Sequence, residues 1–171
     1  MGTLLLAACA TSPAASEREA GGVGAALPTP QRSLSPQIAA TVNLLTAHLA
    51  PHGYRLVQVT RLYRPSEPEM LAAIPRAVFQ LDQSEPDEGY VVVYEFRDPE
   101  AAAAGGRELA GYLASGFGQT NYPVDAQFAL AQMGGTLVLG WWSPERSSMP
   151  DRVRRALQLF RGFGQPIPVP K

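Results

Sequence analysis

The chain has 171 residues, with 14 basic and 15 acidic side chains, two histidines and a single cysteine. This length predicts one domain plus a tail, because domains typically hold about 100–150 residues. Acids and bases are mixed along the chain, so neither a basic stripe nor an acidic tail indicates nucleic acid or a basic partner. After Cys9 no apolar run approaches the roughly 20 residues of a membrane helix.

The cysteine ends the sequence Leu6-Ala7-Ala8-Cys9. This motif resembles the lipobox of bacterial lipoproteins, whose cysteine becomes the lipidated first residue of the mature protein. The resemblance covers residues 1–9 and implies a signal peptide, a lipid on Cys9, and an extracytoplasmic protein held at a membrane. The stretch departs from a full signal peptide, since it has no Lys or Arg and its apolar run is shorter than the usual 7–15 residues. A start codon placed too far downstream accounts for both departures. The alternative is a chance cysteine at an ordinary N-terminus.

Residues 10–34 are rich in Ala, Ser, Pro, Gly and Thr and show no hydrophobic period, as a solvated tether does. We expect the folded domain over residues 35–164. Ser35 followed by Pro36 predicts the start of a helix. Its buried face is expected to carry apolar residues at i, i+4, i+7 and i+11, namely Ile38, Val42, Leu45 and Leu49. Pro51 and Gly53 end this helix.

Two strands are predicted to form a hairpin around a polar loop at residues 84–89. Residues 76–82 alternate in polarity, and residues 89–96 form the run richest in β-branched and aromatic side chains. Upstream, residues 54–63 predict an edge strand, because its arginines discourage pairing with other chains. Residues 67–74 predict a short helical turn.

A helix is predicted from Asp98 and Pro99 to about Ser115, with Asp98 as its N-cap. Residues 124–133 and 136–142 then predict a β-hairpin whose two-residue turn is Gly-Gly. Counting from that turn places residue 133 opposite residue 136, residue 130 opposite residue 139, and residue 128 opposite residue 141.

The last helix is predicted to begin at a capping box made by Ser148 and Asp151. Its arginines are expected to face outward and its apolar residues inward. Residues 165–171 read as a Pro-rich extended tail. We therefore predict an α+β fold, with an antiparallel sheet of about five strands and about three packed helices. The second half is compatible with a split β-α-β arrangement of ferredoxin-like type.

The stretch from residue 76 to residue 160 carries a Tyr-Glu-Phe strand, an Asp-Pro-Glu-Ala-Ala-Ala helix start and a Gly-turn hairpin. In these features it is similar to small secreted or lipid-anchored bacterial proteins of unknown function. That resemblance implies a fold and no activity.

A search for reactive groups finds no convincing constellation. His48 and His52 have the i, i+4 spacing of a zinc pair, but Pro51 interrupts the helix between them, so we interpret them as surface histidines. The acidic loop residues Glu85, Asp87 and Glu88 lack the alternating ligands of a dedicated calcium loop, so a solvated turn is the better interpretation.

The segment Ser115-Gly116-Phe117-Gly118 suggests a phosphate loop but lies at a predicted helix C-terminus, the wrong end of the dipole for an anion. The chain has only two histidines, so few residues could serve as the base of a Ser-His-Asp triad. We expect no cofactor, no metal and no catalytic residue.

Aromatic residues supply one candidate docking surface. Trp141 and Trp142 are adjacent in a strand and point to opposite faces. Trp142 lies on the less apolar face, which Tyr94 and Tyr63 could share. If that face is uncovered, these three residues are a candidate surface for a protein partner. The alternative is that the N-terminal helix covers it, which gives a three-layer fold.

The leading hypothesis is therefore a lipid-anchored extracytoplasmic protein with a non-catalytic binding or interaction module. The alternatives are a hydrolase with an unrecognised site, and a soluble cytoplasmic regulator or inhibitor. An enzyme predicts a deep pocket with convergent polar groups and carboxylates of perturbed pKa.

Overall fold

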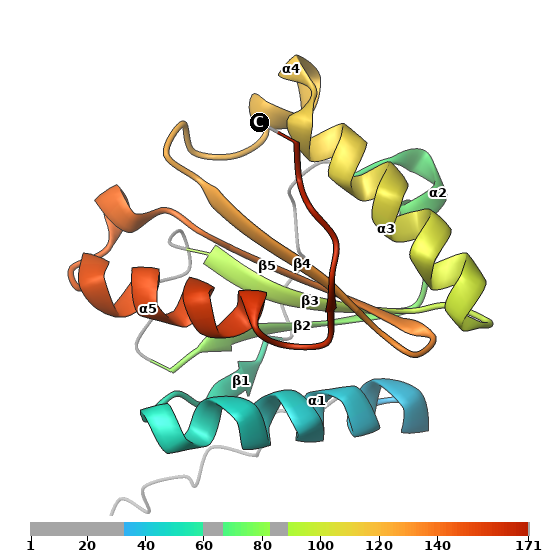
Figure 1. Ribbon diagram of the computed structural model, residues 1–171, viewed down its shortest axis with the longest axis horizontal. Helices are drawn as coiled ribbons and strands as arrows, with labels where there is room; N and C mark the ends of the chain where they lie inside the picture. Colours follow the sequence, from blue (N-terminus) through green and yellow to red (C-terminus); the bar gives the residue numbers. More distant parts are fainter. Residues whose placement is uncertain (1–32, 60–66, 83–88, 171) are drawn as a thin grey trace, which may run out of the picture.

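The computed structural model describes residues 33–59, 67–82 and 89–170 (Figure 1). Within these ranges the fold is α+β, with one six-stranded antiparallel sheet and five α-helices. The strands are β1 (Leu56–Gln58), β2 (Arg76–Leu81), β3 (Gly89–Glu95), β4 (Gln127–Met133), β5 (Thr136–Trp142) and β6 (Gln165–Pro166). The helices are α1 (Pro36–Leu49), α2 (Glu69–Ala72), α3 (Pro99–Ala114), α4 (Gly116–Gln119) and α5 (Pro150–Arg161).

The sheet has the order β1-β2-β3-β5-β4-β6, with every neighbouring pair antiparallel. β3, the run richest in β-branched and aromatic side chains, lies at its centre between β2 and β5. The predicted register of the β4–β5 hairpin is confirmed, since Met133 pairs with Thr136 and Leu130 with Leu139. The turn works because Gly134 adopts a positive φ of 57°, which glycine reaches without steric cost.

Two split crossovers explain why the fold has three layers. β3 and β4 both pair antiparallel with β5, so they are parallel to each other, and α3 connects them. β5 and β6 are related in the same way across β4, and α5 connects them. Both connections step toward the β6 edge, but they start from strands of opposite direction. Crossovers share one hand, so the two helices must cover opposite faces of the sheet.

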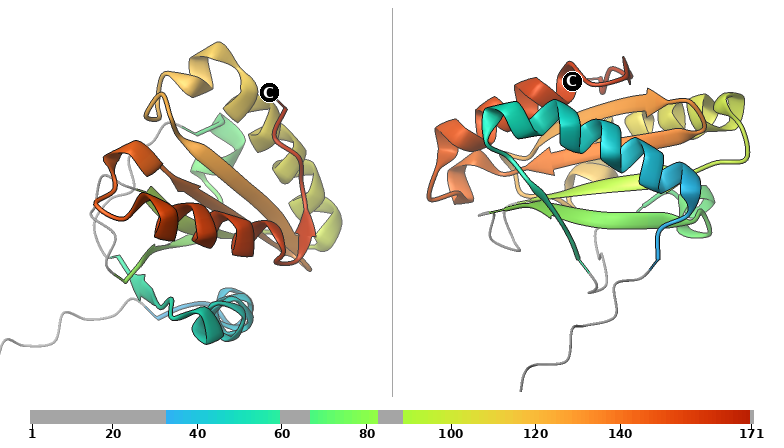
Figure 2. Two further views of the ribbon diagram at one scale, coloured as in Figure 1. Left: turned by 60° about the vertical axis from the view of Figure 1, so that its left-hand side comes forward. Right: turned by 90° about the horizontal axis from the view of Figure 1, so that it is seen from below.

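The structure has this arrangement, with α5 and α3 on opposite sides of the sheet (Figure 2). α1 joins α5 on one face, where the core includes Trp142, Phe160 and Leu45. α3 covers the other face together with α2, over a core that includes Tyr94, Leu109 and Trp141. The predicted split β-α-β connection is present, and α5 lies on the face opposite α3.

Two predicted helix starts are confirmed at the level of the capping bond. The Ser35 hydroxyl accepts from the Ile38 amide at 3.2 Å, and the Asp98 carboxylate accepts from the Ala101 amide at 2.7 Å. The predicted Ser148 capping box is wrong, because α5 has Met149 at its N-cap position with no side-chain capping bond. The cause is Pro150, whose ring suits the first helical position and so starts the helix one residue later.

The segment expected as a free Pro-rich tail packs against the sheet. Gln165 and Pro166 pair with β4, and the Ile167 amide donates to the Leu130 carbonyl at 2.8 Å. The side chains of Ile167 and Val169 then pack on the core beneath α3. The chain therefore crosses from the α5 layer to the α3 layer at its C-terminal end, as Figure 1 shows.

Candidate functional site

The aromatic residues predicted to form a docking surface do not lie on the surface. Trp142 is 0% exposed and packs under α5, with its ring 5.0 Å from the ring of Phe160. Tyr94 is also 0% exposed and lies on the opposite face of the sheet. The condition for a docking surface, an uncovered face, is therefore not met at these two residues. The alternative holds for Trp142, since α1 and α5 cover its face of the sheet and give a three-layer fold. Tyr63 and Cys9, the predicted site of lipid attachment, lie outside the described residues.

The two histidines, interpreted from the sequence as surface residues, differ in burial, since His48 is half-buried and His52 is exposed. The Nε2 atom of His48 lies 3.0 Å from the Leu159 carbonyl oxygen, which joins α1 to α5, and His52 is exposed at the end of the helix. Among the described residues no group of three or more His, Cys, Asp or Glu side chains is placed to hold a metal ion. The acidic loop at residues 85–88 lies outside those ranges. None of the described helices has the length and hydropathy of a membrane span.

A buried polar cluster, formed by Glu67, Arg76 and Tyr94, joins α2 to the sheet. The Glu67 side chain is 6% exposed and accepts a hydrogen bond from the Arg76 Nη1 atom at 2.5 Å. Its other oxygen accepts from the Tyr94 hydroxyl. Burial raises the pKa of Glu67 above its ordinary value, although the Tyr94 hydrogen bond and the Arg76 charge act in the opposite direction.

The raised pKa of Glu67 is explained by its place in this buried polar cluster and does not require a reaction site. Both oxygens of Glu67 have partners, and burial together with the adjacent carboxylate raises the pKa of Tyr94. The Arg76 guanidinium also donates to the Leu71 carbonyl at 3.3 Å, so the cluster attaches α2 to the sheet. Glu67 lines neither of the two cavities described next.

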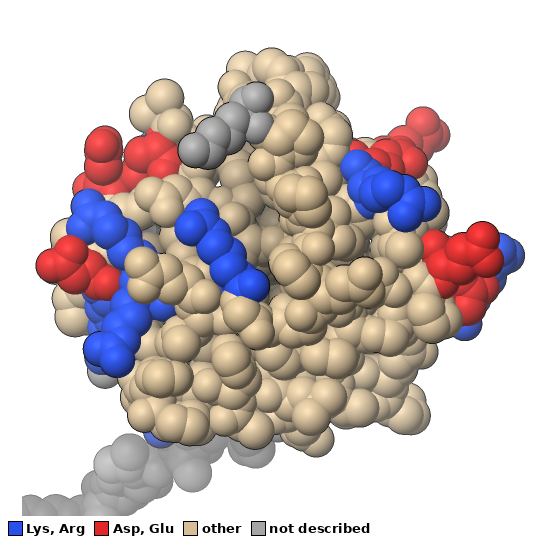
Figure 3. All heavy atoms as spheres, in the orientation of Figure 1, with Lys and Arg blue, Asp and Glu red and all other residues tan. Residues whose placement is uncertain are grey.

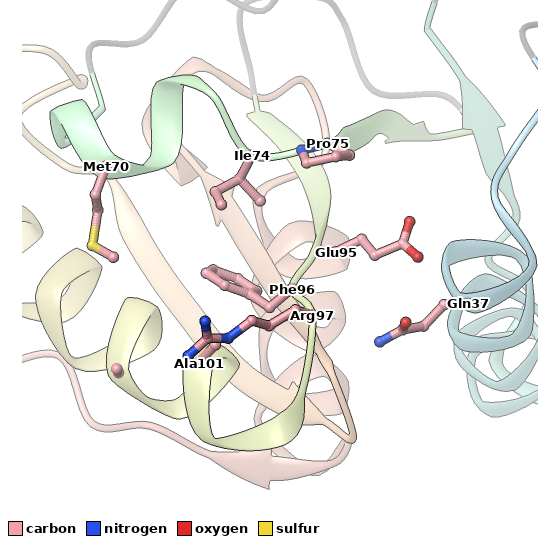
Figure 4. Close-up of a pocket in the computed structure, with 9 residues that line it drawn as sticks. Gln37, Met70, Ile74, Pro75, Glu95, Phe96, Arg97 and Ala101 are labelled. Atoms are coloured by element: carbon pink, nitrogen blue, oxygen red, sulfur yellow. The ribbon is translucent and has the colours of Figure 1, made fainter.

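An open groove lies between α2, the end of β3 and the first turns of α3 (Figure 4). We call it the Phe96 groove; its volume is about 740 Å³. Its apolar wall is formed by Met70, Ile74, Pro75, Phe96, Ala101 and Ala104. In Figure 4 the ring of Phe96 lies between the Met70 side chain on one side and Gln37 on the other.

Glu95 and Gln37 lie at the end of the Phe96 groove that faces α1, whereas the Arg97 side chain extends toward Ala101 (Figure 4). Glu95 is held there by a hydrogen bond from the Ser35 hydroxyl. Arg97 is highly exposed and pairs with Asp98 at 2.9 Å. The capping bond from the Ala101 amide is the main reason that the pKa of Asp98 lies below its ordinary value, so the carboxylate that holds Arg97 stays ionised.

This combination suits a ligand with an apolar body and a polar end. Ligand pockets usually have volumes of about 300–1,000 Å³, a mostly apolar lining and a few fixed polar groups. Met70 is 39% exposed, and methionine adapts its shape to a bound apolar group. The sequence did not indicate this site, because its lining comes from α1, α2, β3 and α3, which only the tertiary fold brings together.

A second cavity, of about 880 Å³, lies between α4, the segment leading into β4 and the C-terminal residues. Of the segment 115–118 that suggested a phosphate loop, Gly116 lines this cavity. There the Ser115 hydroxyl accepts from the Gly118 amide at 3.0 Å and donates to the Tyr112 carbonyl. These bonds cap the end of α3 and the start of α4, which confirms the interpretation of this segment as a cap and turn.

The chain was compared with protein-family models, with curated proteins and with solved structures, and no match was found in any of the three. The candidate site is therefore identified from geometry alone. Of the two cavities, the Phe96 groove has the more apolar lining together with an ordered polar end.

Proposed function

We propose that this chain is a lipid-anchored extracytoplasmic bacterial protein whose domain is a non-catalytic binding module. The motif Leu6-Ala7-Ala8-Cys9 and the tether-like composition of residues 10–34 support the anchor. The observation that carries the binding role is the Phe96 groove, an open apolar surface with an ordered polar end. The ligand is a small molecule or chain end with an apolar body and one polar group.

The contrast between the Phe96 groove and the buried cluster supports binding rather than turnover. In the groove the charged side chains are engaged with neighbours, Glu95 with Ser35 and Arg97 with Asp98. Fixed polar groups orient a ligand. The carboxylate of raised pKa, Glu67, is instead enclosed beneath α2 and hydrogen-bonded at both oxygens.

Labelling cells with a fatty-acid analogue tests the anchor. The wild-type protein is expected in the membrane fraction with the label attached, and Cys9→Ala is expected unlabelled and released by a high-salt wash. The matched control is Ser12→Ala, which leaves the cysteine in place. A Cys9→Ala protein that stays labelled and bound to the membrane would refute the anchor.

Two methionines of equal exposure give a matched test of the Phe96 groove. Met70 lines it and is 39% exposed, whereas Met149 lies outside it at the start of α5 and is 40% exposed. The probe is anilinonaphthalene sulfonate, an apolar dye with one charged group. Met70→Gln is expected to weaken dye binding about fivefold, through loss of one apolar contact. Met149→Gln is expected to leave binding unchanged, and equal losses in both variants would rule out the groove as the site.

A further inference from the structure

The two helices on the Trp142 side of the sheet present a surface with an unusual charge pattern. α1 contains no Asp, Glu, Lys or Arg at all. α5 contains four arginines and one aspartate. Figure 3 shows basic side chains gathered over α5, while the lower part of the view, where α1 lies, is almost free of charged side chains. We call the outward side of α1 and α5 the α1/α5 face.

The arginines point outward because the opposite side of α5 is fully used in the core. Val153, Ala156, Leu157 and Phe160 are buried there. Arg152 is held against the domain, since it donates to the Gly53 carbonyl at 2.7 Å and stacks 4.8 Å from the centre of the Tyr54 ring. Arg155 and Arg161 are exposed, so their charge is directed to solvent.

Apolar side chains accompany this charge. Leu44 is 54% exposed on α1, and Met149 is exposed at the start of α5. The helices on the other side of the sheet differ in sign: α2 carries Glu69 and α3 carries Glu100, Arg107 and Glu108. Exposed arginines beside a neutral helix with a projecting leucine match a lipid surface, which offers anionic phosphates above an apolar layer.

The described part of the chain begins at Ser33, just before α1, and so on this same layer. Between Cys9 and Ser33 lie 23 residues. A flexible chain of that length has a typical end-to-end distance of about 27 Å. A lipid on Cys9 would therefore keep the α1/α5 face within reach of the bilayer, where even a weak surface attraction becomes effective through high local concentration.

We propose that the α1/α5 face docks on an anionic bilayer, with Arg155 and Arg161 binding lipid phosphates and Leu44 entering the interface. This inference rests on the proposed lipid anchor for its cellular role, although the contact itself is made by the folded domain. Membrane binding then has two elements, acyl chains and a basic surface, a combination that holds proteins firmly where a single weak element does not. It also fixes the orientation of the domain at the membrane.

The test uses the full chain carrying Cys9→Ala, so that binding does not depend on the lipid. Its binding is measured by co-sedimentation with vesicles of phosphatidylcholine alone and with vesicles containing 30% phosphatidylglycerol. We expect a clear preference for the anionic vesicles, lost in high salt. Arg155→Gln with Arg161→Gln is expected to weaken binding about 25-fold, since each arginine at a lipid surface contributes about fivefold.

The matched control is Arg55→Gln with Arg107→Gln, which removes the same charge from exposed positions outside α1, α5 and the Phe96 groove. It is expected to bind the anionic vesicles like the parent, and Leu44→Ser to bind severalfold more weakly. Equal losses in the two double variants, or no preference for anionic lipid, would overturn the inference. So would tighter binding of a short single-stranded DNA that displaces the vesicles, which would identify the partner as a polyanion in solution.

The outcomes separate the two proposals. Vesicle binding by the Cys9→Ala chain together with an unlabelled wild-type protein in cells would refute the anchor and leave the docking face standing. A labelled wild-type protein whose Cys9→Ala form ignores anionic vesicles would refute the docking face alone. Thermal unfolding of each variant, matched to the parent, confirms that a loss of binding is not a loss of fold.

Discussion

The two helical layers cover one sheet by different means. Under α1 and α5 the contact is made by large rings, with Trp142 packed against Phe160. Under α3 the helix itself comes close, because Gly105 and Gly106 carry no side chain where the Phe96 ring and Ile167 lie. The third element of that side, α2, is fixed by the buried Glu67 cluster. The sheet is thus covered by large side chains on the side of α1 and α5. On the side of α2 and α3 it is covered by a closely packed helix together with the buried polar cluster.

The difference extends to the outer surfaces. The α1/α5 layer is neutral or basic, whereas α2 and α3 together carry more acidic than basic side chains. Because packing on the sheet fixes only the inner sides of the helices, their outer sides can differ in charge. The Phe96 groove opens on the acidic side and the proposed bilayer contact on the basic side, so a domain docked on lipid would hold the groove away from it.

The largest expected effect comes from the rings under α5. Trp142→Ala is expected to lower the free energy of unfolding by about 4 kcal/mol, through lost apolar burial and the cavity left behind. Leu109→Ala, beneath α3, is expected to cost about 3 kcal/mol for the same reason. Urea unfolding followed by circular dichroism measures both. A Trp142→Ala cost below 1 kcal/mol would show that bulk is not what holds α5 in place.

The buried polar cluster of Glu67, Arg76 and Tyr94 gives the next largest effect. Glu67→Gln is expected to cost about 2 kcal/mol, because the amide nitrogen of glutamine cannot accept the hydrogen bond that a Glu67 oxygen takes from Arg76 or Tyr94. Asp151→Asn, which breaks an exposed pair with Arg154, serves as the control and is expected to have almost no effect. Equal effects of the two variants would mean that the buried cluster does not stabilise α2.

The same cluster predicts a pH dependence with a definite sign. The pKa of Glu67 is raised above 4.5 in the folded protein, so the folded state binds this proton more tightly than the unfolded state. Its contribution to stability is therefore fully present below pH 4.5 and is lost as the pH rises through the raised pKa. Unfolding free energies at pH 4 and pH 7 should consequently show a greater cost of Glu67→Gln at pH 4. A cost that is greater at pH 7 would contradict the raised pKa.

Local signals in the sequence were sufficient for much of this fold. Asp98 followed by Pro99 placed the start of α3, and the glycine pair at 134–135 set the whole β4–β5 register, since a two-residue turn leaves no freedom in the pairing. Periodicity also identified the buried sides of α1 and α5. These features depend on residues close to one another in the chain.

What the sequence could not supply depends on residues far apart in it. β6 escaped prediction because its pairing with β4 comes from a two-residue strand that contains a proline, a residue normally unfavourable in strands. The buried polar cluster joins Glu67 and Tyr94, which are 27 positions apart. The lining of the Phe96 groove comes from four separate elements. Whether Trp142 is exposed stayed open in the sequence for a related reason: strand alternation assigns a face but does not say what covers it.

The close approach of α3 predicts a smaller effect that can take either sign. A Cβ atom added at Gly105 would lie 2.5 Å from the Phe96 ring, whereas one added at Gly111 would meet nothing within 4 Å. Both changes gain helix propensity worth up to about 1 kcal/mol. Gly111→Ala is therefore expected to stabilise by about 0.5 kcal/mol, and Gly105→Ala to destabilise by about 1 kcal/mol, because overpacking outweighs the gain. Thermal melts of the pair check this, and stabilisation by both would mean that α3 has room beneath it.

The smallest expected effect on stability is on the basic side of α5, and it bears on what those arginines are for. Arg155→Gln with Arg161→Gln is expected to change the free energy of unfolding by less than about 0.5 kcal/mol, as exposed substitutions away from the core do. Urea titration of this double variant beside Trp142→Ala measures it on the same helix. A loss of more than 1 kcal/mol would show that the arginines stabilise the fold itself. An unchanged free energy together with weakened vesicle binding would separate the two sides of α5, the inner side holding the sheet and the outer side serving an interaction.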